Sequence, residues 1–534
     1  MSTQSPLPLY ELVKHSLLKS ETLAIIPLDG LPSLIFHEMF MEALMCGHDE
    51  VLKVMVQAWP FPCLPLGSLM EMRKPGNPQS ELENLQLEER NLQTLKAVLH
   101  GLDMLLAQKV HPSRQKLQIL DLRNVHQDFW TLGPRAMAHA WVPDNKCGEQ
   151  TVSDCQVNRK KQLLKVTAEL LTMNVSGNLN GFQAYLFEWA QQRRHLVHLC
   201  CRKLETYEMP FDTFMDVLKM LELNCVQEVE VCDFWSVKNL ASFAPYLGQM
   251  RSLKKLALFS FTNGYCSPSS NILEYVDEFS LYLRELNCLQ ELYLGCAYFL
   301  KGCLDQVLRY LKIPLKTLSI THWEVFPSDW KHLSQCPNIS QLRDLDLRGV
   351  RLTQFNPKPM QLLLDKVAGT LTTLDLESCY MTDSQISAIL PALSHCSQLT
   401  TICFYENNIS MSVLKDLLGH TASMSHLSLE QYPAPLESYN DTGDLQPETF
   451  VQLCAELRET LRAIRQPKMA VFGADPCPHC YHRFLYCTEA SPCSCGFNYD
   501  CKTIRSFLLD FWNQKPRNRI IYKRIQQSLD PCFL

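Results

Sequence analysis

The sequence contains little glycine, no excess of positive charge and no long uninterrupted apolar run. Only 19 of its 534 residues are glycine, too few to favour a glycine-rich phosphate-binding architecture. Its 50 basic and 56 acidic side chains give a net charge of −6, which argues against nucleic-acid binding through bulk charge. The longest uncharged apolar tract, residues 54–70, contains Pro60, Pro62 and Pro65. These prolines exclude a membrane-spanning helix there.

Targeting and catalytic signatures are also missing from the sequence. The amino terminus lacks the basic and apolar pattern of a secretory signal. The 24 cysteines are therefore expected to be reduced thiols or metal ligands in the cytoplasm or the nucleus. We find no GxSxG elbow and no P-loop, and Met41 stands where a zincin-like string beginning at His37-Glu38 needs its second histidine. We expect no catalytic activity; a lone cysteine nucleophile is the alternative.

A repeated pattern, apolar-x-x-apolar-x-apolar, is the main positive signal. It begins at Leu196, Val226, Leu253, Leu289, Leu315, Leu342, Leu371, Leu399 and Met424, with an earlier copy at Leu117. The mean interval of about 28.5 residues lies in the leucine-rich-repeat range of roughly 20–29 residues. Each copy predicts a short strand that buries its closely spaced apolar residues.

Helical spacing follows the strands. After Leu376, Thr382 or Asp383 can cap a helix, and Ser410 can cap the next one. The expected buried stripes are Ile386, Ile389, Leu390 and Leu393 in the first helix, and Val413, Leu414, Leu417 and Leu418 in the second. Alternating strands and helices predict an α/β leucine-rich-repeat solenoid, shaped like a horseshoe.

Three regions are expected along the chain. Residues 1–110 form an N-terminal helical cap and docking region with an inserted loop at 71–90. Residues 111–465 form the solenoid, interrupted by a polar insertion at 143–161. Residues 466–534 form a cysteine-rich C-terminal cap and tail.

Acids predominate at the third, fifth and seventh positions of the repeats, which should face one concave surface. These acids are Asp121, Glu228, Glu230, Glu291, Asp344, Asp346, Asp375, Glu377 and Glu430. The bases are Arg123, Arg202, Lys255 and Arg348, and the aromatic residues are Phe259, Tyr293 and Tyr405. This surface predicts a protein partner with a basic, partly apolar segment. An acidic face that only maintains solubility is the alternative.

The chain resembles the PRAME family of leucine-rich-repeat proteins. The resemblance rests on SLLKSETLAI at 16–25, AWPFPCLPLG at 58–67, LDLRNVHQDFW at 120–130, LCCRKLE at 199–205, LSHCSQLTT at 393–401 and PCPHC at 476–480. It implies a substrate-recognition subunit of a cullin-RING ubiquitin ligase that uses a cullin of type 2 and elongin B/C. It also implies roles in transcriptional repression, including retinoic-acid signalling, and expression in germ line and tumours.

Two segments near the amino terminus carry the docking expectation. Leu17 and Leu23 lie in a run similar to an elongin-binding helix, although Glu21 occupies the position of the usual small residue. Leu31, Pro32, Ile35 and Met39 match a cullin-selecting box. A helix begun by Pro32 would place Ile35 and Met39 on one face. Helices that merely cap the solenoid are the alternative.

Two further motifs have competing interpretations. Cys477, Cys480, Cys493 and Cys495 could hold one structural zinc ion; free thiols in a capping segment are the alternative. The LxxLL strings at 102–106 and 414–418 match helices that enter nuclear-receptor grooves. We interpret them as core residues, because repeat helices generate the same spacing for packing.

Overall fold

A computed structural model gives the positions of most of the repeat region and much of the N-terminal region. The structure describes residues 28, 31–73, 81–108, 116–123, 164–172, 181–207, 210–233, 235–260, 272–297, 300, 302–323, 325–353, 355–465, 469–476, 483–486 and 490–491. Two compact units divide the chain. The first contains residues 1–229 and 249–253, and the second contains 230–248 and 254–534.

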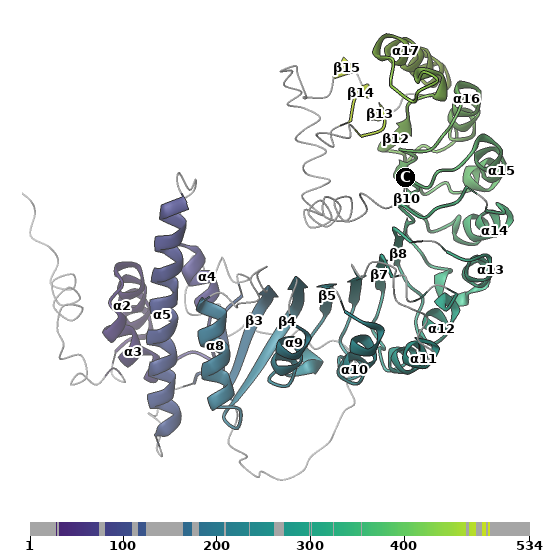
Figure 1. Cartoon of the computed structure of the whole chain (residues 1–534). Coiled ribbons are helices and arrows are strands. Elements are labelled where there is room, and N and C mark those ends of the chain that lie inside the picture. The colour runs from purple at the N-terminus through teal and green to yellow at the C-terminus, as the bar shows by residue number, and fades with distance from the viewer. Residues whose placement is uncertain are drawn as a thin grey trace, which may run out of the picture. The chain divides into compact units, whose positions relative to one another are not determined.

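The first unit combines a helical region with four parallel strands (Figure 1). Its helices are α2 (Ser33–Cys46), α3 (Asp49–Gln57), α4 (Leu66–Glu71), α5 (Glu81–Ala107), α8 (Gly181–Gln192), α9 (Phe211–Leu218) and the 3-10 helix η3 (Leu223–Cys225). Its strands are β1 (Cys63–Leu64), β2 (Ile119–Asp121), β3 (Leu164–Thr172) and β4 (Val197–Tyr207). Strand β5 (Glu228–Asp233) contains the boundary between the units.

Aromatic packing holds the helical region of the first unit together. Helix α2 begins at Ser33, directly after Pro32. The rings of Phe36 and Phe40 meet the Trp59 indole edge-on, at centroid distances of 5.9 and 4.7 Å. The Trp59 Nε1 donates to the Cys63 carbonyl oxygen at 2.9 Å. The buried indole is thus both packed and hydrogen-bonded, and it links α2 to strand β1.

The second unit alternates strands and helices along its whole length. Its strands are β6 (Lys255–Ser260), β7 (Glu291–Gly295), β8 (Thr317–Thr321), β9 (Asp344–Asp346), β10 (Thr373–Asp375), β11 (Thr401–Cys403), β12 (Leu429–Pro433), β13 (Ala470–Gly473), β14 (Leu485–Tyr486) and β15 (Ala490–Ser491). Its helices are α10 (Val237–Leu247), α11 (Ile272–Leu283), α12 (Leu304–Arg309), α13 (Pro327–Gln335), α14 (Lys358–Val367), α15 (Asp383–Ser394), α16 (Met411–His420) and α17 (Pro447–Ile464), with 3-10 turns η5 (Pro337–Ile339) and η6 (Leu436–Ser438). Strands β6–β13 pair in parallel, and β14 and β15 add antiparallel.

Leucine register confirms the predicted α/β leucine-rich-repeat fold. In the six repeats that start from Leu253 to Leu399, each strand begins two residues after the predicted first leucine. One aligned, buried row contains Leu256, Leu292, Leu318, Leu345, Leu374 and Ile402. Strands form one layer of this unit and helices the other (Figure 1). Burial of this row between the layers therefore joins the repeats into one core.

Helix starts also agree with the sequence. Ser410 caps α16, where its Oγ accepts from the Val413 N–H at 3.4 Å. Thr382 precedes α15, and its N–H donates to Gln385 Oε1 at 3.0 Å. The predicted stripes of both helices are buried, so capping and periodicity specify the same helices.

A left-handed backbone turn follows each of five consecutive strands. It always falls seven residues after the first leucine of the repeat, at Cys296, His322, Gly349, Ser378 and Glu406, with φ between 51° and 69°. Glycine adopts this conformation freely, whereas the other four residues are strained there. The left-handed turn is therefore a property of the repeat rather than of one glycine.

The last predicted repeat is corrected by the structure. Strand β12 pairs Leu429 with Thr401, which places the first leucine at Leu427, three residues after Met424. Glu430 consequently aligns with Ile402 and faces the interior, where it is fully buried. Its carboxylate accepts hydrogen bonds from the Arg465 Nη1 at 2.6 Å and the Tyr432 hydroxyl at 2.7 Å. The prediction that Glu430 faces the concave surface was wrong.

None of the helices in the described segments is long and apolar enough to cross a lipid bilayer. The longest, α5, mixes charged and apolar residues along its 27 positions.

Candidate functional site

The outward-facing residues of strands β7–β11 form a surface that we call the acidic strand face. Because strand side chains alternate, the partners of the buried leucines all point away from the helices. The acidic strand face contains Glu291, Tyr293, Asp344, Asp346, Arg348, Asp375, Glu377 and Tyr405. Five carboxylates and one guanidinium therefore share one face of consecutive repeats.

One half of this face remains accessible. Glu291, Tyr293 and Asp344 are partly exposed. The Tyr293 hydroxyl donates to Glu291 Oε2 at 3.2 Å, and the Thr317 hydroxyl donates to Asp344 Oδ2 at 3.0 Å. The Lys255 ammonium lies 5.0 Å from the Tyr293 ring centroid. These side chains are held by neutral donors and a ring contact, so their carboxylates can still accept bonds from a partner.

The other half is neutralised by the chain itself, beginning with Arg348. The Arg348 Nε donates to Asp346 Oδ1 at 2.9 Å, and its Nη2 donates to Asp346 Oδ2 at 2.8 Å. Its Nε also lies 3.3 Å from Asp375 Oδ2 on the next strand. One guanidinium therefore bridges carboxylates of β9 and β10, with the two-point geometry that arginine provides.

Arg483 neutralises the next two acids from a distant part of the sequence. It precedes β14, and its Nη2 contacts carboxylate oxygens of both Glu377 and Glu406. Its guanidinium lies 4.9 Å from the Tyr405 ring centroid. Glu377 and Tyr405 were both predicted to contact a partner, yet Arg483 covers them. Repeat spacing did not point to Arg483 or Glu406, because neither occupies the third, fifth or seventh position of a repeat.

Burial of this charged cluster changes its protonation. Burial raises the pKa of Asp375 to about 7; the Asp346 and Glu377 carboxylates also raise it, whereas Arg348 lowers it. Burial likewise raises the pKa of Glu377, opposed by the positive charge of Arg483. The cluster therefore keeps more protons at neutral pH than exposed carboxylates would.

Oxygen and sulfur atoms of Asp375, Glu377 and Cys403 lie within 4.8 Å of one another, which is close enough for a shared metal ion. Arg348 and Arg483 already supply positive charge to the two carboxylates. A metal ion would be repelled by both guanidiniums, and burial raises the pKa of the Cys403 thiol well above its usual range. We therefore assign these groups to ion pairing.

The remaining predicted contact residues lie on β5 and β6. Glu228 belongs to the first unit, where its Oε2 lies 3.6 Å from the Lys203 Nζ. Glu230 belongs to the second unit and is buried 3.9 Å from the Lys255 Nζ. Phe259 covers Gly295 of β7, because a Cβ built on that glycine would collide with the Phe259 ring.

The predicted cullin-docking box falls on α2 of the first unit. Pro32 is exposed, and Leu31 and Ile35 are half-buried. Met39 is fully buried, since it lies on the helix face that packs into the core, and its side chain is not presented at the surface in this structure. Leu34, at 57% exposure, is the more accessible apolar neighbour. Leu17 and Leu23 lie outside the described residues.

The structure describes the second LxxLL string but not the cysteines of the predicted zinc site. Leu414, Leu417 and Leu418 of the second LxxLL string are fully buried, which confirms the core interpretation. The four cysteines of the predicted zinc site, Cys477, Cys480, Cys493 and Cys495, lie outside the described residues.

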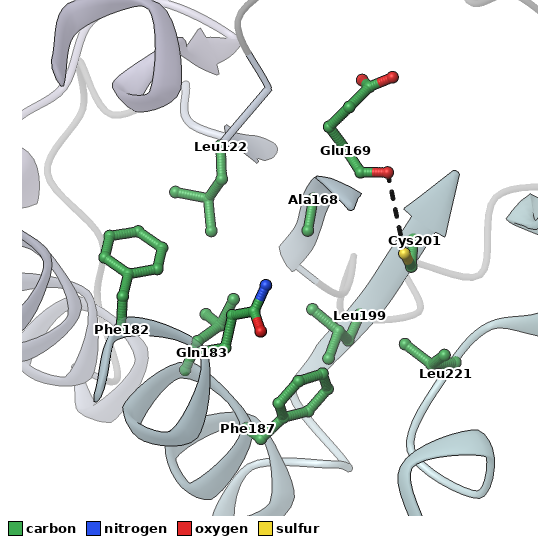
Figure 2. Close-up of a pocket in the computed structure, with 10 residues that line it drawn as sticks. Leu122, Ala168, Glu169, Phe182, Gln183, Phe187, Leu199, Cys201 and Leu221 are labelled. Carbon is green, nitrogen blue, oxygen red and sulfur yellow. Dashed lines mark hydrogen bonds between the residues drawn. The ribbon is translucent and has the colours of Figure 1, made fainter. Parts of the chain in front are cut away.

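A small cavity of about 220 Å³ lies in the first unit (Figure 2). Its walls are mainly apolar and come from α8 and strands β3 and β4, with Leu122 and Leu221 at its edges. The Cys201 Sγ lies 4.0 Å from the Glu169 carbonyl oxygen at one side.

Strand–helix repeats with an accessible strand face define a protein-binding repeat protein. The chain belongs to the PRAME family: residues 6–130 match the PRAME N-terminal domain, and residues 164–495 match the PRAME C-terminal domain. PRAME family member 12 of Homo sapiens is 47% identical over 92% of this chain and 98% of that relative. PRAME family member 8 of Homo sapiens is 45% identical over 93% of this chain and 100% of that relative.

A solved structure of the leucine-rich repeat-containing protein LegL7 from Legionella pneumophila is similar at 14% identity and a TM-score of 0.31, covering 56% of this chain and 90% of that protein.

Proposed function

We propose that this chain is a non-catalytic substrate-recognition subunit of a cullin type 2 ubiquitin ligase. It would hold a protein target on the acidic strand face while other subunits transfer ubiquitin. The observation that carries the proposal is the accessible half of that face, formed by Glu291 and Tyr293 on β7 and Asp344 on β9, the two strands on either side of β8. We place this activity in the cytoplasm or the nucleus, without direct contact with nucleic acid or membrane.

The chemistry of the accessible half selects the partner. Two carboxylates beside a tyrosine ring suit a lysine or arginine whose alkyl stem packs on the ring while its charge meets the acids. The Lys255 ammonium already contacts the Tyr293 ring, at 5.0 Å from the centroid. A basic, partly apolar segment of the target would make equivalent contacts, and the surrounding negative charge would steer its approach.

Docking to elongin B/C and the cullin would use the N-terminal region. Leu31, Pro32 and Ile35, with Leu34 beside them, give α2 an accessible apolar edge. Such an edge can enter a groove on a partner helix bundle. A zinc ion held by the C-terminal cysteines stays part of the proposal as a structural cap, because four protein ligands leave no open coordination position.

The test is quantitative affinity purification of three full-length variants from the same cells. The docking variant carries Leu31→Ala, Pro32→Ala and Ile35→Ala; the face variant carries Glu291→Lys and Asp344→Lys. The charge-matched control carries Glu278→Lys and Asp416→Lys, two exposed acids on helices α11 and α16. We expect the docking variant to lose the cullin and keep the target, the face variant to do the reverse, and the control to keep both. Equal retention of the cullin by all three would refute the assigned docking residues, and absence of the cullin from the wild-type purification would refute the ligase assignment.

A transcriptional corepressor or signalling scaffold that works without a cullin is the second candidate. The burial of Met39 favours it, because one of the four predicted box residues is then unavailable for docking. It predicts that wild-type protein captures its target but no cullin or elongin subunit in the same purification.

A further inference from the structure

Two cysteines of the first unit lie in contact although 24 residues separate them in the sequence. The Cys200 Sγ on β4 and the Cys225 Sγ on η3 are 2.8 Å apart. Cys200 is buried, whereas Cys225 is partly exposed. No two of the described cysteines are joined by a disulfide, so the pair is present as two thiols.

Backbone hydrogen bonds hold this contact from both sides. The Glu222 N–H donates to the Leu199 carbonyl at 2.9 Å, and the Gln227 N–H donates to the Arg202 carbonyl at 2.8 Å. Cys225 therefore lies between Glu222 and Gln227, which are both hydrogen-bonded to β4. Cys200 lies between the acceptors of those two bonds, Leu199 and Arg202. The proximity of the sulfur atoms follows from the chain path rather than from one rotamer.

We propose that Cys200 and Cys225 form a reversible disulfide when the protein meets a hydroperoxide. The Cys225 thiolate attacks one peroxide oxygen, the O–O bond breaks, and the leaving oxygen departs as water or an alcohol after protonation. Cys225 is then a sulfenic acid. The Cys200 sulfur attacks the Cys225 sulfur, the S–O bond breaks, and the leaving hydroxide takes the Cys200 proton and departs as water. Two thiols are oxidised while the peroxide is reduced, and a dithiol reductant reverses the bond.

The surroundings divide the roles between the two thiols. A hydrogen bond from Cys200 lowers the pKa of Cys225 to about 7, aided by the Lys165 ammonium and opposed by burial and by Glu222. The same hydrogen bond and burial raise the pKa of Cys200. A partly exposed thiolate beside a buried thiol is the arrangement of an attacking and a resolving cysteine. His198 also lies nearby, with its Nδ1 3.8 Å from Glu222 Oε2.

The decisive experiment is non-reducing peptide mapping of the full-length protein after hydrogen peroxide treatment and alkylation in denaturant. Cys201 offers a matched control, because it is adjacent to Cys200 and buried, but its Sγ contacts the Lys203 carbonyl at 2.8 Å instead. We expect one cross-linked peptide pair joining Cys200 to Cys225, absent from Cys200→Ala and Cys225→Ser and retained in Cys201→Ala. Oxidation of wild-type Cys225 without this link, or a link that survives Cys200→Ala, would overturn the proposal.

A second measurement covers the case in which Cys200→Ala fails to fold. Iodoacetamide labelling of Cys225 against pH should give a midpoint near 7 in wild-type protein, and Cys201→Ala should leave it unchanged. A wild-type midpoint in the ordinary thiol range, above about 8, would overturn the assigned roles. Where Cys200→Ala folds, loss of its donor should move the midpoint upward.

Discussion

The tripeptide Asp-Leu-Arg occurs once in each unit and makes almost the same local contact in both. In the first unit the Arg123 Nε and Nη2 donate to Asp121 at 2.9 and 2.7 Å. In the second unit the corresponding Arg348 distances to Asp346 are 2.9 and 2.8 Å. The arginine backbone N–H also reaches the aspartate in both units. The tripeptide itself therefore determines this ion pair.

The neighbouring strands make the two pairs different. Thr167 lies beside Asp121 in register, whereas Asp375 lies beside Asp346. Arg348 consequently serves two carboxylates, and its side chain is 11% exposed compared with 20% for Arg123. Repeat position fixes where a charge lies, but the residue one strand away decides how much that charge stabilises the fold.

The largest expected effect is the loss of the more heavily used arginine. Arg348→Met leaves the buried Asp346 and the partly buried Asp375 without their common partner, and should lower the free energy of unfolding by about 3–5 kcal/mol. Arg123→Met removes the partner of one carboxylate and should cost less, about 1–3 kcal/mol. Both losses can be measured by urea denaturation, and hydrogen exchange can assign them to β9 for Arg348→Met and to β2 for Arg123→Met. Equal losses would mean that the neighbouring strand contributes nothing.

The second-largest expected effect is a dependence of the stability of the second unit on pH, caused by Asp375. Because its folded pKa of about 7 lies above the unfolded value of 3.8, the folded state binds more protons between these pH values. The contribution of Asp375 to the free energy of unfolding is therefore fully present below about pH 4. It is lost as the pH rises to about 7, which lowers the free energy of unfolding by roughly 2–4 kcal/mol. Asp375→Asn should flatten the unfolding free energy of β9–β11 across this window. An unchanged slope in that variant would assign the pH dependence to other groups.

Removal of the long-range partner should have an intermediate effect. Arg483→Met leaves Glu377 and Glu406 without their shared guanidinium, and should destabilise the second unit by about 2–3 kcal/mol. Arg309→Met provides the control, since it breaks a surface pair with Asp305 on α12 and a ring contact 6.0 Å from the Tyr310 centroid, and should cost below about 0.5 kcal/mol. Faster hydrogen exchange in β13 and β14 of Arg483→Met, but not of the control, is the expected signature.

The turn after Arg348 should give the smallest change. Gly349 has a φ of 69°, and a Cβ there would collide with the His322 ring. Four other repeats tolerate a side chain at this turn, so Gly349→Ala should cost only about 1–2 kcal/mol in thermal unfolding. Gly419→Ala is the control, because its Cβ would meet nothing within 4 Å on α16. The control should be neutral or stabilising by up to about 1 kcal/mol.

Local rules predicted most of the fold from the sequence. Leucine spacing located the strands, and Thr382 and Ser410 located helix starts, because both signals act within one repeat. The predicted start of the last repeat was wrong. Met424 and Leu427 are both apolar, and only the pairing of β12 with β11 shows that the repeat begins at Leu427.

The candidate site was less predictable. Asp344 and Glu377 were both predicted to face the concave surface, as the third and seventh residues of their repeats. Only Asp344 remains accessible to a partner. The difference is Arg483, which lies 106 residues after Glu377. No local pattern reports such a contact. Burial of Met39 likewise depends on the core against which α2 packs, which the spacing of residues within the helix does not report.

The salt-dependent affinity of the captured target tests the central claim most directly, namely that the accessible half of the acidic strand face binds a basic segment. Once affinity purification has supplied that target, its dissociation constant can be measured for wild-type protein, the face variant and the charge-matched control. Binding by wild type and control should weaken as salt rises, and Glu291→Lys with Asp344→Lys should lose at least about tenfold in affinity together with most of that salt dependence. Identical affinities and identical salt slopes for the three proteins would contradict the claim.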